Sequence, residues 1–521
     1  FEALRDRARD IKNHTLAHLD FYLEEFERKV LALGGHVHWA PTAADARRII
    51  ADLCKSVNAR TIAKSKSMVS EEIGLNEHLE ALGIEPVETD LGEYIIQLRH
   101  EPPSHIIAPA VHLTKDQVAD TFLAHHSKLG FTKRLTERND LVAEARYVLR
   151  QKFLDADVGL NGANFLVAET GSSMLVTNEG NADLSNTLPK MQIVLASIEK
   201  VIPTLEDAAV LLRVLARSAT GQESSAYTTL NTGPKRAPDL DGPSAYHVVI
   251  LDNGRSSVLG TEMQDMLRCI RCGACMNHCP VYGAIGGHAY GWVYPGPIGS
   301  VLTPQLIGVE QGGNLPNAST FCGRCESVCP VRIPLPKLMR HWREREFERH
   351  LTPKAVRQGL ALWSWMARRP RLYRRVTGWT NRVLALFGPQ GLLGINLQDT
   401  PWLLAGALGR TAMLRHMLPK GPDFTIRNRF GGNALIPACE RAHVETVTLL
   451  VTTPIDVNHI NNLGWTCLLE IVILGDGGPR HVEVTKLVLA AGANPNIADK
   501  DGVSPLRHAR QRNQRDRKSV V

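Results

Sequence analysis

Seven of the ten cysteines of this chain fall in two short runs. The first run, Cys269–Pro280, has the spacing C-x2-C-x2-C-x3-C-P, and the second run, Cys322–Pro330, repeats this pattern without its first cysteine. Three thiolates at this spacing can bind three corners of one [4Fe–4S] cluster, and in two-cluster ferredoxins the fourth cysteine ligates the other cluster. Zinc is the alternative metal, but structural zinc sites use separated pairs of ligands. The spacing therefore predicts iron–sulfur clusters and a role in electron transfer.

Other candidate residues carry a weaker signal. Lys64 and Lys66 lie in a basic loop directly after a predicted strand, where open α/β sheets bind ligands, so we expect an anion-accepting cleft near both lysines. Loop solubility explains these lysines about as well. Glu179 can act as a carboxylate in such a cleft, although a turn role also explains it, and His288 is interpreted as structural. We assign no catalytic residue, because in an electron carrier the cofactor supplies the chemistry.

The composition is that of an ordinary globular protein with several domains. The chain has 521 residues, which is too many for one hydrophobic core and predicts two to four domains. No apolar run is long enough to cross a bilayer, and Phe1–Arg5 shows neither an initiator Met nor a signal-peptide pattern. Clustered cysteines without a secretory signal indicate metal binding rather than disulfides, so we expect a cytoplasmic protein.

The elements that position the cysteines belong to two predicted domains. Helical and strand patterns alternate over residues 1–235, which predicts an α/β domain with a largely parallel sheet. Residues 236–345 are predicted to form a helical ferredoxin domain, in which a Gly- and Pro-rich stretch between the runs wraps the cofactor. The predicted helices of the α/β domain are Thr42–Cys54, Glu71–Leu82 and Leu205–Arg217, the last capped by Thr204, and its predicted strands include residues 36–39 and 61–63.

Residues 346–395 are predicted to be a basic helical segment. Between Lys337 and Arg382 the chain has 13 Lys and Arg against three Glu, with Trp363, Trp365 and Trp379 among them. A basic segment of this kind can contact a membrane surface peripherally or bind an acidic partner. We favour helix packing with the arginine heads reaching solvent, and we expect no nucleic acid partner.

An internal repeat occupies residues 396–521. The motif that begins at Thr400 recurs from Asn433 and Thr466, each 33 residues on, and again from Ser504 after a five-residue insertion. A period of about 33 residues with this start resembles ankyrin repeats, which form an α-solenoid that binds proteins. Only 12 residues follow Ala509, so the last repeat is predicted to be incomplete. Two scattered cysteines, Cys439 and Cys467, then fall in repeat helices as packed residues rather than ligands.

Residues 1–395 resemble the lactate-utilisation protein B family of bacteria. The resemblance rests on segments that occur in order: residues 64–72, 88–95, 102–106, 175–181 and 251–255, the first cysteine run, and residues 286–299. It implies an α/β domain of the NagB/RpiA/CoA-transferase-like type, a helical domain with two [4Fe–4S] clusters, and a role with sister A and C proteins in oxidising L-lactate to pyruvate. It assigns Cys269, Cys272, Cys275 and Cys329 to cluster 1, and Cys279, Cys322 and Cys325 to cluster 2.

Two departures from the family matter. Its members begin further upstream, so we expect that this sequence lacks an N-terminal part, and they do not in general carry ankyrin repeats.

Cluster 2 lacks a fourth cysteine, because Ser319 stands where the alignment of the two runs places the counterpart of Cys269. We expect a labile four-iron cluster that can lose iron to give [3Fe–4S]. The alternative is that another residue, such as His278 or His288, closes the site.

Two functions follow from these patterns. The first is an iron–sulfur electron-transfer subunit of a complex that oxidises L-lactate. The second is an ankyrin-based protein-interaction protein whose iron–sulfur part is a redox sensor or a relic. Co-purification with a cysteine-rich partner and bleaching of the clusters by lactate would separate the two.

Overall fold

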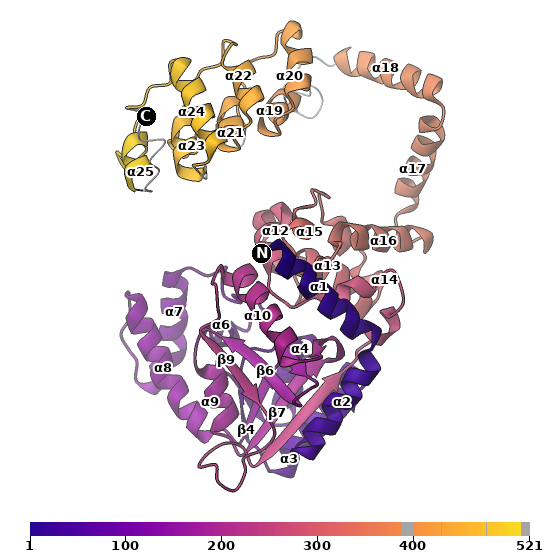
Figure 1. The fold of residues 1–521 in the computed structure, drawn as a ribbon, viewed down its shortest axis with the longest axis vertical. Coiled ribbons are helices and arrows are strands. Elements are labelled where there is room, and N and C mark those ends of the chain that lie inside the picture. The colour runs from indigo at the N-terminus through magenta and orange to yellow at the C-terminus, as the bar shows by residue number, and fades with distance from the viewer. Residues whose placement is uncertain (387–399, 429, 476, 512–521) are drawn as a thin grey trace. The chain divides into compact units, whose positions relative to one another are not determined.

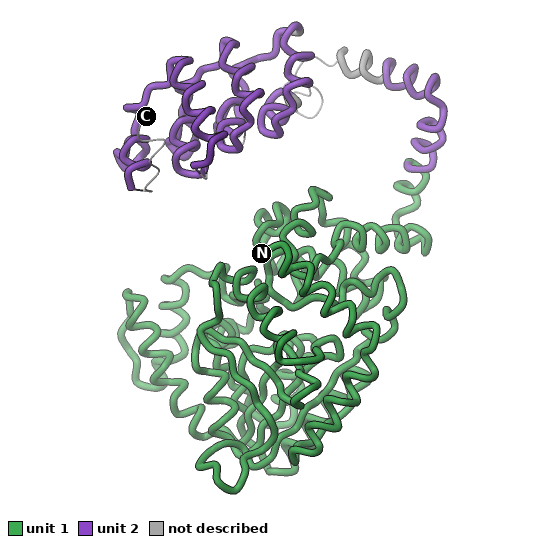
Figure 2. Tube along the Cα trace, viewed as in Figure 1, with its two compact units in different colours: residues 1–359 green, residues 360–521 purple. Residues whose placement is uncertain are grey.

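The structure is a computed structural model that describes residues 1–386, 400–428, 430–475 and 477–511. It divides into two compact units, residues 1–359 and residues 360–521 (Figure 2). Each unit has its own hydrophobic core, and both cysteine runs belong to the first unit.

Six parallel strands form the main sheet of the first unit, in the order β1-β10-β7-β4-β2-β3 (Figure 1). The inner strands β7 and β10 are buried almost throughout, which explains their continuous apolar sequences, since parallel sheets are covered on both faces. β10 pairs with both β1 and β7, so the sheet reaches past residue 235. The strands are β1 (His36–Ala40), β2 (Thr61–Lys64), β3 (Glu85–Glu88), β4 (Val158–Gly162), β7 (Met191–Ser197) and β10 (Ala245–Leu251).

Alternate residues of these strands face two different cores. Val249 and Leu251 pack in a core with α3, whereas Val248 and Ile250 pack in a core with α2. The helix predicted from Thr42 begins one residue later, and Thr42 caps it by accepting a hydrogen bond from the backbone N–H of Asp45. The helices around the sheet are α2 (Leu19–Ala32), α3 (Ala43–Ser56), α4 (Met68–Glu72), α5 (Leu75–Ala81), α6 (Leu91–Arg99), α7 (Lys115–His126), α8 (Arg138–Asp155) and α9 (Asn181–Thr187).

The helix predicted over Glu71–Leu82 is two helices, α4 and α5. Gly74 separates them with a φ of 60°, a left-handed conformation that glycine adopts without a steric penalty. On either side of this break, α4 packs against β4 and β7 of the main sheet, and α5 packs against β3.

A smaller sheet continues the α/β domain, with the strand order β8-β5-β6-β9. Helix α10 (Leu205–Thr220) begins at the predicted cap Thr204, and it packs against α1 (Glu2–Ala17). The strands are β5 (Phe165–Val167), β6 (Ser172–Thr177), β8 (Val201–Ile202) and β9 (Tyr227–Asn231).

The cysteine-rich region shares one core with α1 and α10. Ile11 of α1 and Leu215 of α10 belong to the same buried cluster as Ile298 and Trp342. Arg5 of α1 is buried and donates from Nε to the carbonyl oxygen of Cys329 at 3.1 Å, so α1 also holds the second run. The helices of this region are α11 (Ala274–Asn277), α12 (Pro280–Ile285), α13 (Gly296–Ile307), α14 (Val309–Gly312), α15 (Arg324–Ser327) and α16 (Leu335–Glu348).

The basic segment forms α17 (Lys354–Ala367) and α18 (Pro370–Leu386). α17 buries none of its residues, and Trp363, Trp365 and Trp379 are each more than half exposed. The expected packing of these tryptophans is therefore not found in the described part of the chain. Among the described residues, no helix is long and apolar enough to cross a membrane.

Helix pairs in the second unit stack as ankyrin repeats do. The first helices pack in the series α19-α21-α23-α25, and the second helices pack in the series α20-α22-α24. Cys439 and Cys467 lie in their buried core, as expected. The predicted boundary at residue 395 and the predicted incomplete end of the last repeat lie outside the described residues. The helices are α19 (Thr400–Ala407), α20 (Thr411–Met417), α21 (Leu435–Glu440), α22 (Val444–Leu450), α23 (Cys467–Leu474), α24 (Pro479–Ala490) and α25 (Pro505–Gln511).

A glycine in β4 tests the packing of α9 on the sheet. A Cβ atom at Gly159 would lie 1.8 Å from the carbonyl oxygen of Ser185, so Gly159→Ala must displace backbone. We expect it to lower the free energy of unfolding by about 2 kcal/mol or more. Gly180→Ala is the control, because a Cβ atom there meets nothing within 4 Å. Urea unfolding measures both variants, and equal stability would show that β4 and α9 do not pack this closely.

Candidate iron–sulfur sites and an adjoining cavity

The two cysteine runs fold as a structural repeat. Arg271 and Phe321, each just before a cysteine, have φ values of 61° and 53°, and Gly273 and Gly323, each just after it, have φ values of 72° and 78°. Left-handed backbone is costly for Arg and Phe, and such conformations concentrate at functional sites. In each run a short helix follows, α11 or α15, and carries the next cysteine.

The four cysteines predicted for cluster 1 line one cavity. Cys269, Cys272 and Cys275 come from the first run and Cys329 from the second, with Ile298 among the apolar walls. Two backbone N–H groups donate to these sulfurs: that of Arg271 to Cys269 Sγ at 3.4 Å, and that of Ile333 to Cys329 Sγ at 3.3 Å. Such donors stabilise the thiolate form that a metal requires.

The three cysteines predicted for cluster 2, Cys279, Cys322 and Cys325, line a second cavity. His278 and Ser319 also line it. His278 Nδ1 lies 3.0 Å from the carbonyl oxygen of Ala274. His288 lines neither cavity, and its Nε2 lies 2.8 Å from the carbonyl oxygen of Pro102, which fits the structural role expected for it.

The chemistry of these donors fits iron–sulfur clusters. Burial raises the pKa of Cys325 to about 12 and that of Cys329 to about 11, so their thiolates form only beside a metal, whose binding releases the protons. Each thiol set surrounds a cavity, as ligands at separate corners of a cluster must.

Ser319 takes the structural place of the missing cysteine. The backbone N–H of Phe321 donates to Ser319 Oγ at 3.2 Å, as the N–H of Arg271 does to Cys269 Sγ. The second cavity is therefore lined by a hydroxyl at the place where the first cavity has a fourth thiol.

A buried network of charges joins the first run to the α/β domain. Arg255 forms ion pairs with Glu72 at 2.6 Å and with Glu199 at 3.1 Å, and Arg271 pairs with Glu199 at 3.2 Å. Tyr294 donates its hydroxyl to Glu72 at 2.7 Å, and the guanidinium of Arg271 lies 4.6 Å from the centre of the Tyr294 ring. Burial alone would raise the pKa of Glu199, but Arg255 and Arg271 outweigh it and lower the pKa to about 2.

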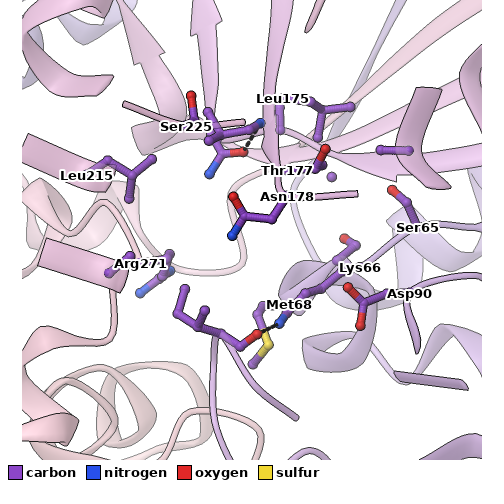
Figure 3. A pocket seen from close by; sticks show the side chains of 18 of the residues that line it. Ser65, Lys66, Met68, Asp90, Leu175, Thr177, Asn178, Leu215, Ser225 and Arg271 are labelled. Atoms are coloured by element: carbon purple, nitrogen blue, oxygen red, sulfur yellow. Dashed lines mark hydrogen bonds between the residues drawn. The ribbon is translucent and has the colours of Figure 1, made fainter. Parts of the chain in front are cut away.

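A cavity of about 290 Å³ lies at the carboxyl ends of β2 and β4. Figure 3 shows Lys66 and Asp90 on one side of it, Arg271 on the opposite side, and Asn178 between them. Arg271 lines this cavity and the cluster 1 cavity alike. The α/β cavity and the first thiol set are therefore neighbours.

The structure corrects the expected role of Lys64. Lys66 lines the cavity, but Lys64 is fully buried outside it, between Glu71 at 2.8 Å and Glu88 at 2.7 Å. Burial alone would lower the pKa of Lys64, but the two carboxylates outweigh it and raise the pKa. Lys64 therefore joins α4, through Glu71, to the end of β3, through Glu88, and its role is structural.

Glu179 lines the cavity, as the first of its two expected roles, a carboxylate in an α/β cleft, requires. Burial and the neighbouring Asp90 carboxylate raise the pKa of Glu179 to about 7, although the side chain keeps contact with solvent at the cavity mouth. The carboxyl group of Glu179 can therefore carry a proton near neutral pH.

Sequence reasoning missed Lys200, which also lines the cavity. Glu199 and Lys200 are adjacent charges within an otherwise uncharged and mostly apolar run, residues 191–203, that forms β7 and β8. Charged residues are rarely buried unless they are paired or functional, so this interruption was an available signal.

Family models match three parts of the chain. The LUD domain matches residues 23–251, the 4Fe-4S dicluster domain matches residues 265–333, and ankyrin repeats in three copies match residues 402–499. These matches confirm the predicted multidomain fold class and support iron–sulfur clusters as the bound group.

Curated relatives match most of the chain. Lactate utilization protein B of Macrococcus caseolyticus is 51% identical over 359 residues, which are 68% of this chain and 74% of the relative. That of Geobacillus kaustophilus is 48% identical over 393 residues, or 75% of this chain and 82% of the relative. The uncharacterized electron transport protein YkgF of Escherichia coli K12 is 47% identical over 374 residues, or 72% and 78%. A solved ankyrin repeat domain from Acinetobacter baumannii is 49% identical, with a TM-score of 0.24 over 25% of this chain and 65% of that chain.

Ser319 provides a test of the open corner. Ser319→Cys should supply a fourth thiolate, because the side chain already sits at the position that a cysteine holds in the first run. Electron paramagnetic resonance before and after mild oxidation should show a [3Fe–4S] signal in the wild type that is suppressed in the variant. Ser327→Cys is the control, since Ser327 is exposed and lines neither cavity. A spectrum that neither oxidation nor Ser319→Cys changes would contradict the open corner.

Cluster binding should not need the ankyrin repeats. Every residue that lines the two thiol cavities lies between Ile106 and Met339, inside the first unit. A chain that ends at residue 395 should therefore keep the full iron and sulfide content of the whole protein. Iron loss on this truncation would show instead that the repeats stabilise the cluster region.

Proposed function

Because this chain belongs to the lactate utilization protein B family, we propose that it is the iron–sulfur electron-transfer subunit of a complex that oxidises L-lactate to pyruvate. The observation that carries the proposal is the pair of thiol-lined cavities, each of which draws cysteines from both runs. Two [4Fe–4S] clusters bound there would accept and release single electrons.

The placement of the two thiol sets supports a path for electrons. Cys272, Cys275 and Cys329 are buried, and their cavity adjoins the α/β cavity through Arg271. Cys322, in the second set, is exposed. Cluster 1 would thus lie inside the subunit and cluster 2 near its surface, where a partner protein can exchange electrons.

The proposed partners are the sister A and C proteins of the lactate-utilisation system. The ankyrin stack offers a second surface for a protein partner. An interaction protein with a redox-sensing iron–sulfur part remains the second candidate, and the ankyrin match is the observation that favours it. On that alternative, lactate would not reduce the clusters even with the sister proteins present.

The proposal is tested by anaerobic purification with iron and sulfide analysis, followed by addition of L-lactate together with the sister proteins. We expect L-lactate to bleach the visible absorption of the clusters when these proteins are present, because the reduced clusters absorb less visible light. Cys275→Ala should reduce both the iron content and the lactate-dependent bleaching, since Cys275 lines the inner thiol cavity. Absence of iron, or clusters that lactate leaves oxidised in the full mixture, would contradict the proposal.

A further inference from the structure

Lys200 is a buried ammonium group that Glu199 and Cys269 attract only over a longer distance than an ion pair. It ends the turn Ile198–Lys200 between β7 and β8, and only 6% of its surface is exposed. Among the residues that the structure describes, none accepts a hydrogen bond from it, and no carboxylate lies within salt-bridge distance. Glu199, its neighbour in sequence, is engaged by Arg255 and Arg271. A buried charge without a partner is costly, which points to an anion that Lys200 would bind.

The side chains that line the α/β cavity include one more cationic group than carboxyl groups. Three cations line it, Lys66, Lys200 and Arg271, against two carboxyl groups, Asp90 and Glu179. Lys66 lies with the carboxyl groups and donates to the carbonyl oxygen of Ile107, whereas Arg271 lies on the opposite side (Figure 3). Because Arg271 is paired with Glu199, the positive charge that lacks a partner is that of Lys200, and a single ammonium group suits a monoanion.

The size and walls of the cavity favour an organic anion. Its volume of about 290 Å³ is at the lower end of the range for small-molecule sites. Met68, Ile106, Leu175 and Leu215 contribute apolar wall, which an inorganic ion would leave uncovered. Asn178 points into the space and offers both a hydrogen-bond donor and an acceptor (Figure 3).

We propose that this cavity binds a small organic monocarboxylate, and that Lys200 is the cation that holds its carboxylate group. The identification of the ligand as a 2-hydroxy or 2-oxo acid, such as L-lactate or pyruvate, rests on the proposed function. Because Arg271 lines this cavity and the inner thiol cavity, the bound acid would lie next to cluster 1.

The test is equilibrium dialysis of the full-length, cluster-loaded protein with labelled pyruvate and labelled L-lactate, in the presence or absence of inorganic phosphate. Lys200→Gln should raise the Kd for the carboxylate by about tenfold or more, because it removes a charge-assisted hydrogen bond. Lys12→Gln is the matched control. Lys12 is also buried near Glu199 and Cys269, but it donates to the carbonyl oxygen of Glu199 and does not line the cavity, so the Kd should stay within about twofold.

A second variant tests the same site independently, in case Lys200→Gln does not fold. Asn178→Asp changes an exposed side chain at the cavity and adds a negative charge, so it should also weaken carboxylate binding while the iron content stays unchanged. No carboxylate binding by the wild type, equal Kd values in all variants, or displacement of the acid by equimolar phosphate would each overturn the site. The measurement needs no electron flow. Carboxylate binding that depends on Lys200, with no lactate-dependent reduction, would support the site and contradict only the proposed function.

Discussion

The structure depends on the exchange of one cysteine between the two runs. Cys329 lies in the cavity of Cys269, Cys272 and Cys275, although it belongs to the second run, and Cys279 of the first run lies with Cys322 and Cys325. Neither thiol set is complete until both runs have packed together. The helices between and around the runs share one core with α1 and α10, so cluster assembly is coupled to folding of the whole first unit.

A buried ion network holds this assembly against the sheet. Arg255 follows β10, Glu72 ends α4, Glu199 follows β7, and Arg271 belongs to the first cysteine run. Removing one partner would leave a buried charge unpaired, which costs about 3–5 kcal/mol. The network therefore fixes the first run at the carboxyl edge of the sheet, and it brings Arg271 to the wall of the α/β cavity.

The local patterns in the sequence predicted much of this arrangement. Cysteine spacing predicted iron–sulfur clusters, and the family resemblance assigned the thiols to two sets. Strand and helix alternation predicted the α/β class, and the repeat period predicted the ankyrin stack. The failures involve long-range contacts or backbone detail. Gly74 divides a helix that periodicity alone joins. The sequence around Lys64 predicts a cleft residue, because it does not show that Glu88, from the neighbouring strand of the sheet, forms an ion pair with Lys64. Lys200 and Arg271 meet at one cavity only because the cysteine region folds back onto the sheet.

The exchange of cysteines is tested most directly by comparing single-cysteine variants. Cys269→Ala, Cys329→Ala and Cys322→Ala would be reconstituted anaerobically, reduced, and examined by electron paramagnetic resonance together with iron and sulfide analysis. The account predicts that Cys269→Ala and Cys329→Ala lose the same cluster signal, and that Cys322→Ala loses the other one, because Cys329 shares a cavity with Cys269. A spectrum of Cys329→Ala that matches Cys322→Ala would show that each run holds its own cluster, and it would contradict the account.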